Sequence, residues 1–192
     1  RNNLIQTVFD VERVYQLEKA AAVLKKTVAV HLKIDTGMGR IGVRSGEEVK
    51  EMVDVIAACP HVELTGVFTH FADADGEDDG YTKRQKETFD RLTAMLPNSI
   101  MRHAAASAAA ARYENPRYDM VRQGIPLYGC GEWTGKLPVR PALSWHTEIV
   151  YTKKVLKGAC ISYGCTFCAD KDMRIATLPV GYGDGYSRIL SG

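Results

Sequence analysis

Residues 27–42 read TVAVHLKIDTGMGRIG, and the first part of this stretch alternates between apolar and polar side chains. The apolar positions are Val28, Val30, Leu32 and Ile34. Alternation with a period of two predicts a β-strand whose opposite face carries His31, Lys33 and Asp35. In a (β/α)8 barrel such a polar face would point inward and mark a site at the carboxyl end of the strand. An edge strand with one solvated face is the alternative.

Strands and helices alternate through the first two thirds of the chain. We predict strands at 4–9, 27–34, 62–71, 100–103 and 119–122. Helix starts are predicted at an N-cap and at two capping boxes, which are Asp10, Ser45 with Glu48, and Thr82 with Gln85. Because helices separate the strands, the strands should lie parallel in one sheet of an α/β fold.

The last third of the chain has a different pattern, in which we predict strands at 144–153, 158–163 and 173–180. No helical pattern of comparable length separates them. The preceding segment 129–141 is rich in Gly and Pro, as domain linkers are. We therefore predict an α/β domain over residues 1–135 and part of a mostly-β domain over residues 136–192.

The composition excludes several classes of protein. The 192 residues carry 25 Lys and Arg against 23 Asp and Glu, which disfavours a strongly basic nucleic-acid-binding protein. No apolar run reaches the length of a membrane span, and the opening residues lack the pattern of a signal peptide. The five Cys residues are an odd number, which we interpret as reduced thiols in a cytoplasmic protein. Cys160, Cys165 and Cys168 are expected to be buried thiols rather than ligands of a metal cluster.

The glycines that follow the first polar-faced strand, Gly37-x-Gly39-x-x-Gly42, formally match a dinucleotide-binding fingerprint. In that motif the helix begins within the glycines, so that its N-terminus meets the pyrophosphate. Here the predicted cap, Ser45, comes after the last glycine, and Arg40 adds bulk where the ligand must approach. A nicotinamide-nucleotide site is therefore the weakest alternative.

Polar side chains also mark the ends of other predicted strands. They are His70, His103 and Arg122. Barrel enzymes place their active sites at such strand ends, so we interpret these residues as a candidate site. Ser107 with the amides of Gly124 and Ile125 could hold an anion, although Ser107 could instead serve only as a helix N-cap.

Five motifs, in order, resemble the bacterial alanine racemases. They are HLKIDTGMGRIG at 31–42, THFADAD at 69–75, VRQGIPLYG at 121–129, ISYG at 161–164 and PVGYGDGY at 179–186. The resemblance covers essentially the whole chain. It implies a partial (β/α)8 TIM-type barrel that binds pyridoxal phosphate (PLP), followed by part of a β-strand-rich domain, in a homodimer with shared active sites. It also implies interconversion of L-alanine and D-alanine, which supplies D-alanine for the peptidoglycan of the cell wall.

The resemblance implies roles for three residues of the reaction centre. Arg122 matches the arginine that hydrogen-bonds the pyridine nitrogen of PLP. Because an arginine cannot accept a proton, that nitrogen stays unprotonated and PLP is a weaker electron sink. Tyr163 matches the catalytic tyrosine, a base on the L-face of the substrate that reaches the active site of the other subunit. His70 matches the hydrogen-bond partner that links this tyrosine to Arg122.

Further positions match residues around the cofactor and the substrate. Ser107, Gly124 and Ile125 match the residues that hold the PLP phosphate. Arg40 matches an arginine near the PLP phenolic oxygen and the substrate carboxylate, and Lys33 matches a lysine that is often carbamylated to orient it. The positions implied along the access channel are Tyr182, which also contacts substrate, and, further out, Asp75, His103 and Arg188.

Two departures from the family pattern bear on activity. The lysine that binds PLP and acts as the second acid–base group is implied on an earlier barrel strand, in a Lys-Ala-Asn-Ala-Tyr-Gly-like motif that this sequence lacks. We therefore expect an internal fragment of a longer enzyme, inactive by itself. Ala106 stands where the family has Asn before Ser107. A serine or broad-specificity racemase and a non-catalytic PLP-binding module remain alternatives, and a lysine motif upstream would favour an enzyme.

Overall fold

The computed structural model describes residues 4–113, 118–130 and 138–190. The chain divides into two compact units, residues 1–142 and 143–192, and each is described by itself. The boundary that we predicted near residue 135 lies outside the described residues. Within the described ranges, no helix combines the length and the apolar character that crossing a membrane requires.

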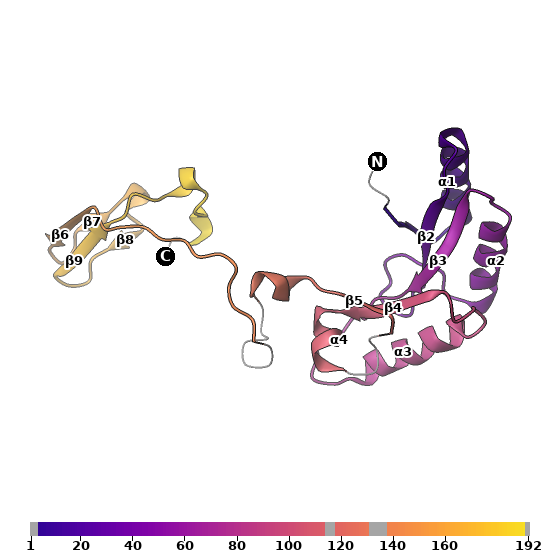
Figure 1. The fold of residues 1–192 in the computed structure, drawn as a ribbon. Helices are drawn as coiled ribbons and strands as arrows, with labels where there is room; N and C mark the ends of the chain where they lie inside the picture. The colour runs from indigo at the N-terminus through magenta and orange to yellow at the C-terminus, as the bar shows by residue number, and fades with distance from the viewer. Residues whose placement is uncertain (1–3, 114–117, 131–137, 191–192) are drawn as a thin grey trace. The chain divides into compact units, whose positions relative to one another are not determined.

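Unit 1 is built on a five-stranded parallel sheet (Figure 1). Its elements are β1 (Gln6–Val8), α1 (Val11–Leu24), β2 (Val28–Lys33), α2 (Gly46–Ala57), β3 (Val62–Phe68), α3 (Gly80–Thr93), β4 (Met101–Ala106), α4 (Ser107–Arg112), β5 (Met120–Arg122) and the 3-10 turn η2 (Ile125–Tyr128). The strands stand in chain order and each neighbouring pair is parallel. A helix after each of the first four strands, without reversal of strand order, is the arrangement of a barrel wall. The predicted partial barrel is confirmed.

The helices pack against the apolar side of β2. One core cluster joins Val30 and Leu32 of this strand to residues of α1, α2 and α3, among them Val14, Val49 and Phe89. His31 and Lys33 lie on the opposite face of β2, where they are also buried. Because β1 and β3 flank β2, the edge-strand alternative is wrong, and the two-faced pattern belongs to an interior strand.

Two helix starts follow the predicted local signals. The carboxylate of Asp10 accepts a hydrogen bond from the amide of Arg13 at 2.8 Å where α1 begins. Ser45 and Glu48 form both hydrogen bonds of a capping box where α2 begins. These signals are local in sequence, so the structure satisfies them without help from distant residues.

The capping box predicted for Thr82 and Gln85 is wrong. Helix α3 begins earlier, at Gly80, with Asp79 at the cap position. This start places both side chains inside the helix, where they are buried. The Thr82 hydroxyl donates to the carbonyl oxygen of Asp73 at 3.0 Å, so it ties the helix to the preceding loop instead of capping it.

Unit 2 contains two antiparallel strand pairs, which agree with the predicted mostly-β character. β6 (Tyr151–Val155) pairs with β9 (Met173–Thr177), and β7 (Cys160–Ile161) pairs with β8 (Phe167–Cys168). Three 3-10 turns complete the unit, namely η3 (Tyr163–Cys165), η4 (Tyr182–Asp184) and η5 (Arg188–Leu190). The strand predicted at 144–153 is correct only from Tyr151 onward.

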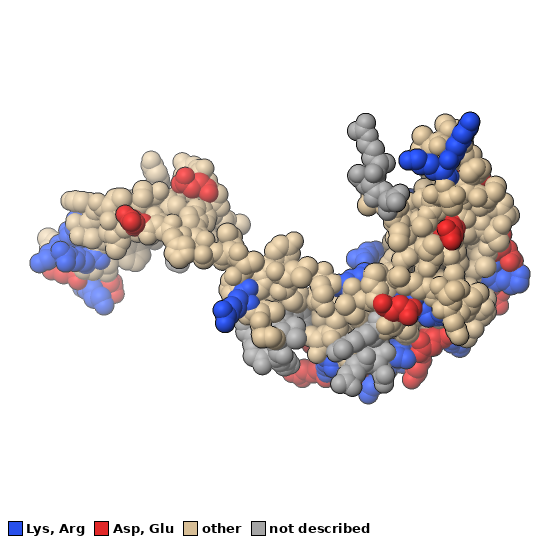
Figure 2. All heavy atoms as spheres, in the orientation of Figure 1, with Lys and Arg blue, Asp and Glu red and all other residues tan. Residues whose placement is uncertain are grey.

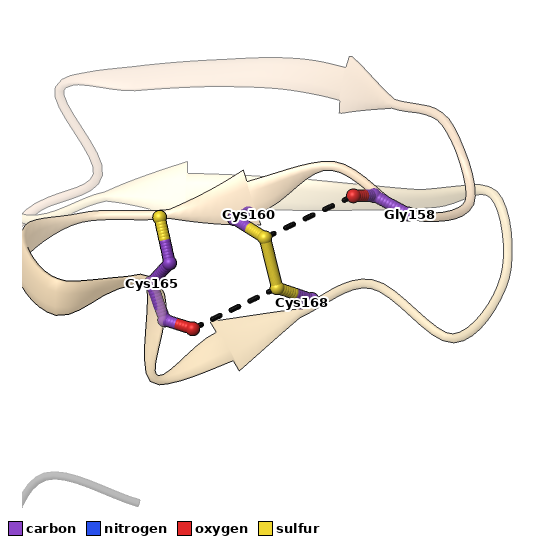
Figure 3. The surroundings of a disulfide bond; sticks show 4 residues. All are labelled: Gly158, Cys160, Cys165 and Cys168. Atoms are coloured by element: carbon purple, nitrogen blue, oxygen red, sulfur yellow. Dashed lines mark hydrogen bonds between the residues drawn. A yellow bond between two sulfur atoms is a disulfide. The ribbon is translucent and has the colours of Figure 1, made fainter.

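The expectation of reduced, buried thiols at Cys160, Cys165 and Cys168 is wrong. Cys160 and Cys168 form a disulfide (Figure 3), and Cys165 is a free, exposed thiol. The first two residues are direct partners across the β7–β8 pair, which brings their Cα atoms to 4.0 Å. Because Cys160 and Cys168 are not reduced thiols, these two residues no longer support the prediction of a cytoplasmic protein.

The surface charge of unit 1 is mixed. On the face shown in Figure 2, Lys and Arg side chains lie among Asp and Glu side chains over the helices. This agrees with a formal net charge of +2.

Candidate active site

The carboxyl ends of the parallel strands bring the predicted polar residues of unit 1 together. Arg122 ends β5, His103 lies within β4, and His70 follows β3. Hydrogen bonds connect all three. These residues come from strands far apart in sequence, and the parallel sheet brings them together.

Arg122 is a partly buried cation that is held from several sides by neutral acceptors. Its Nη1 donates to Nδ1 of His103 at 2.6 Å, and its Nη2 lies 3.0 Å from Nδ1 of His70. Nη2 also approaches the carbonyl oxygens of Thr69 and Ala104, each at 2.9 Å. The guanidinium carbon lies 5.5 Å from the ring centroid of Phe68. No Asp or Glu of the described residues forms an ion pair with it.

This arrangement fixes the protonation of the two imidazoles. The pKa of His103 is lowered to about 3, first by burial and then by the nearby Arg122 cation. The pKa of His70 is lowered by burial first and then by Arg122. Both rings are therefore neutral near pH 7. Because a guanidinium only donates, each Nδ1 must accept, and each Nε2 must carry the proton.

Lys33 lies on the inward face of β2 and is only 1% exposed. Its Nζ donates to the carbonyl oxygen of Ile34 at 2.8 Å. The pKa of Lys33 is lowered to about 8, mainly by burial; Asp35 opposes this shift, and Arg122 and Arg40 add to it. A sizeable neutral fraction near pH 8 makes this amine a nucleophile, as modification by carbon dioxide requires.

Asp35 shapes the loop that carries Arg40. One carboxylate oxygen accepts hydrogen bonds from the amides of Gly37 and Gly39, at 3.1 and 3.0 Å. Although burial raises the pKa of Asp35, these two amides and Arg44 outweigh it and lower the pKa. A Cβ at Gly42, which has a φ of +128°, would lie 2.6 Å from the Asp35 nitrogen. The glycines therefore turn the loop back on β2, rather than opening a helix for a nucleotide.

Gln85 of α3 organises the strand ends, although sequence reasoning gave it only a capping role. Its side-chain amide donates to the Thr36 hydroxyl and the His70 carbonyl oxygen, each at 3.2 Å. Its carbonyl oxygen accepts from the Ala72 amide at 2.8 Å. Gln85 is 1% exposed. A Gln within the apolar stripe that Phe89 continues is the sequence signal that could have revealed this role.

Ser107 lies beside Gly124, but the Gly124 amide that the anion-cradle hypothesis offers to an anion is already paired with Ser107. The Gly124 amide donates to the Ser107 hydroxyl oxygen at 3.0 Å. Helix α4 has Ala106 at its cap position, and that cap forms no side-chain hydrogen bond. The alternative of Ser107 as an N-cap only is therefore wrong. Ile125 begins the turn η2 directly after Gly124.

The structure places the residues of the implied access channel in different settings. Asp75 is exposed in the loop after β3. His103 was expected further out, but it is 3% exposed and contacts Arg122, because its position in β4 directs it inward. Unit 2 carries the two remaining channel residues, Tyr182 and Arg188, and also the predicted catalytic Tyr163. Tyr163 is 91% exposed and lies between the two disulfide cysteines in sequence. No cluster of metal-binding side chains occurs in the described ranges.

Two family models match this chain. The alanine racemase N-terminal domain matches residues 1–132, and the alanine racemase C-terminal domain matches residues 142–192. The alanine racemase of Chlorobaculum tepidum is 42% identical over 192 residues, which cover 96% of this chain and 50% of that protein. The chain spans about half the length of the curated relatives it matches.

Solved structures give the same assignment. The alanine racemase of Clostridium difficile 630 matches with a TM-score of 0.84 and 34% identity, over 97% of this chain and 50% of that one. The histidine racemase of Leuconostoc mesenteroides matches with a TM-score of 0.79 and 28% identity, over 96% and 51%. Both family models, the identity to curated relatives and the barrel fold agree, and the chain therefore belongs to the alanine racemase family.

Proposed function

We propose that the full-length protein interconverts L-alanine and D-alanine with PLP as its cofactor. The observation that carries the proposal is the half-buried Arg122, which neutral imidazoles and carbonyl oxygens hold at the carboxyl ends of the parallel strands. A cation without a carboxylate partner is suited to an anionic, hydrogen-bond-accepting ligand. The relatives named alanine racemase support the same reaction.

The residues of unit 1 fit this cofactor. Arg122 Nε has no acceptor among the described residues, so it can donate to the pyridine nitrogen. The Ser107 hydroxyl accepts from Gly124 and keeps its own proton for a phosphate oxygen. The amide of Ile125 would complete this cradle. When bound, PLP withdraws electron density from the Cα atom of an attached amino acid and so makes the Cα proton removable.

Tyr163 is proposed to move the proton on the L-face, with His70 as its partner. His70 accepts from Arg122 through Nδ1, which leaves its Nε2–H as a donor. That donor would stabilise the phenolate form of Tyr163, the form that accepts a proton. The exposure of Tyr163 in unit 2 leaves its hydroxyl available to the site of another subunit, which supports a homodimer with shared active sites. A lysine of the full-length protein would act on the opposite face.

Arg40 and Lys33 are proposed to serve the carboxylate side of the substrate. Arg40 is exposed on the loop that Asp35 shapes, and it would meet the substrate carboxylate or the phenolic oxygen of the cofactor. Carbamylation of Lys33 would replace a buried cation by an anion near Arg40 and Arg122. The anion would orient Arg40 toward the site. Tyr182, Asp75 and Arg188 are proposed to line the access channel.

The choice of substrate is the least constrained part of the proposal. Alanine is favoured because the matched relatives are named for it, whereas a solved relative is named a histidine racemase. Serine or a broader set of amino acids is the second candidate. The product D-alanine would be available for peptidoglycan synthesis.

The proposal is tested by incubating the full-length protein with L-alanine and measuring D-alanine by chiral chromatography, with and without added PLP. We expect PLP-dependent conversion that exceeds conversion of L-serine and L-histidine. Conversion of serine or histidine alone would correct the substrate. Binding of PLP without conversion of any of the three would contradict the racemase and favour a non-catalytic module.

A further inference from the structure

We propose that His31 is a positioning residue that holds the imidazole of His103 in the one orientation in which its Nδ1 faces Arg122, and thereby aims the guanidinium of Arg122. The inference rests on the proposed function, since Arg122 is the residue that would meet the cofactor ring. His31 is 7% exposed and lies on β2, whereas His103 lies on β4 and Arg122 on β5. The three residues thus span the wall of the barrel.

A chain of hydrogen bonds connects the three side chains. Arg122 Nη1 lies 2.6 Å from His103 Nδ1, and His103 Nε2 lies 2.8 Å from His31 Nδ1. The His103 ring is also stacked on Phe68, with centroids 4.8 Å apart and planes within 8°. Stacking fixes the plane of this ring, but a 180° rotation about the Cβ–Cγ bond would keep that plane and exchange the two edges of the ring. The two nitrogen contacts decide which edge faces Arg122.

The direction of each hydrogen bond follows from the first donor. Arg122 donates, so His103 Nδ1 accepts and its Nε2 carries the proton. His31 Nδ1 must then accept, which places the His31 proton on Nε2. Burial lowers the pKa of both rings, in agreement with neutral imidazoles. His31 Nε2 is buried and has no hydrogen-bond partner in the described residues.

The sheet is arranged to let His31 reach His103 across β3. The β2–β3 register shifts between Val30 and His31, so that Gly66 rather than Thr65 pairs with His31. A Cβ at Gly66 would lie 2.6 Å from the His31 ring. A side chain on β3 at this point would therefore displace the imidazole from its path to β4.

The unpartnered Nε2 argues that His31 serves more than packing. Burying a donor without an acceptor is unfavourable, and an apolar side chain would avoid it. What a histidine offers here, and an apolar side chain does not, is the acceptor at Nδ1. That acceptor meets the one proton of His103 that Arg122 cannot satisfy.

The test compares His31→Asn with His31→Leu in the full-length protein. The two replacements have nearly the same shape, but only Asn offers an oxygen to His103 Nε2–H. The first readout is the ¹⁵N spectrum of the histidines without substrate, which reports the tautomer of each ring. The second readout is kcat with alanine, and unfolding curves check that each variant is folded.

We expect wild type and His31→Asn to show His103 with its proton on Nε2. We expect His31→Leu to show an average of two tautomers, because the ring then also takes up the flipped orientation, in which Arg122 no longer meets Nδ1 and no longer fixes the proton. We expect kcat to fall about tenfold in His31→Leu, the factor for one lost neutral hydrogen bond, and much less in His31→Asn. Equal losses in both variants, or an unchanged His103 spectrum in His31→Leu, would overturn the role of His31.

A measurement on wild type alone keeps the test decisive if a variant does not fold. His31 and His103 should both carry their proton on Nε2, and a proton on Nδ1 of His103 would refute the chain of hydrogen bonds. The spectra need no turnover. A wild type that shows the expected tautomers but does not racemise alanine would therefore contradict the proposed function and not the His31–His103 contact.

Discussion

Nδ1 of His103 lies 2.6 Å from Nη1 of Arg122, and this contact joins a positively charged guanidinium to a neutral imidazole. Burial is the largest cause of the lowered pKa of His103, which is about 3, and Arg122 is the second. An imidazole that stays neutral over the physiological range is a dependable acceptor. Arg122 can therefore keep its orientation without a carboxylate to neutralise it.

Replacing Arg122 by Leu should raise the pKa of His103, because the nearest positive charge is removed. The pKa should still remain below the ordinary histidine value of 6.5, since burial persists. Titration of the His103 ring by NMR measures this. Arg112→Leu is the matched control, because Arg112 donates to the carbonyl oxygens of Gly76 and Glu77 and should leave His103 unchanged. A full return to 6.5 would show that burial has little effect.

Lys33 should react with carbon dioxide near pH 8. At this pH about half of the amine is neutral, given its pKa of about 8. The neutral nitrogen attacks carbon dioxide and loses a proton, which yields a carbamate anion near Arg122 and Arg40. A carbamate resonance in ¹³C-bicarbonate should appear in wild type and disappear in Lys33→Met. The same resonance in both proteins would place the modification elsewhere.

The lowered pKa of Lys33 also predicts how stability changes with pH. Between pH 8 and the unfolded value of 10.5, the unfolded chain binds more protons at this residue than the folded chain. The contribution of Lys33 to the free energy of unfolding should therefore rise with pH across this range. Urea unfolding of wild type and Lys33→Met measures the difference, which should change little below pH 8. A difference that fell with rising pH would contradict the lowered pKa.

Gln85→Leu should lower the free energy of unfolding by about 1–3 kcal/mol, because the Ala72 amide and the Thr36 hydroxyl lose a buried partner. Gln85→Glu keeps the acceptor for the Ala72 amide but loses the donor to the Thr36 hydroxyl, so it separates the two contacts. The control is Gln16→Leu, since Gln16 is exposed on α1 and should change stability by less than about 0.5 kcal/mol. Equal effects of Gln85→Leu and Gln16→Leu would contradict the organising role.

Alkylation of the denatured, unreduced protein should label Cys59, Cys130 and Cys165 and leave the disulfide cysteines unlabelled. Reduction should then expose the remaining pair. Removing the disulfide by a Cys160→Ala, Cys168→Ala double replacement should destabilise unit 2 by about 2–3 kcal/mol, from the entropy of a loop with a sequence separation of 8. Labelling of Cys160 before reduction would contradict the pairing.

The sequence predicts what depends on neighbours along the chain and misses what depends on the fold. The capping box of Ser45 and Glu48 and the two faces of β2 follow from spacing alone, and both are correct. Gln85 and His103 were misassigned because their partners lie in other elements and loops of the fold. The disulfide was missed because the β7–β8 pairing, which places Cys160 opposite Cys168, is only two residues long and gives no alternation to read.

The family motifs predict Arg122, His70 and Ser107 as site residues, and the structure of unit 1 brings Arg122 and His70 into contact and places Ser107 beside Gly124. What the motifs do not reveal is the support behind them. His31 and Gly66 act through contacts across the sheet, and Gln85 acts from α3 on the loops after β2 and β3. Such contacts leave no fixed spacing in the sequence. The placement of Tyr163 at a site shared between subunits stays a prediction.

Proton exchange at Cα measures the role of Tyr163 most directly. With alanine in D₂O, Tyr163→Phe should abolish exchange of the L-alanine Cα proton and preserve exchange of the D-alanine proton, because a separate group serves the D-face. Racemisation itself must slow equally in both directions, since the two enantiomers have equal free energy. Tyr151→Phe, an exposed tyrosine of β6, should leave both exchange rates unchanged. Equal loss of exchange from both enantiomers in Tyr163→Phe would contradict a two-sided mechanism with Tyr163 on the L-face.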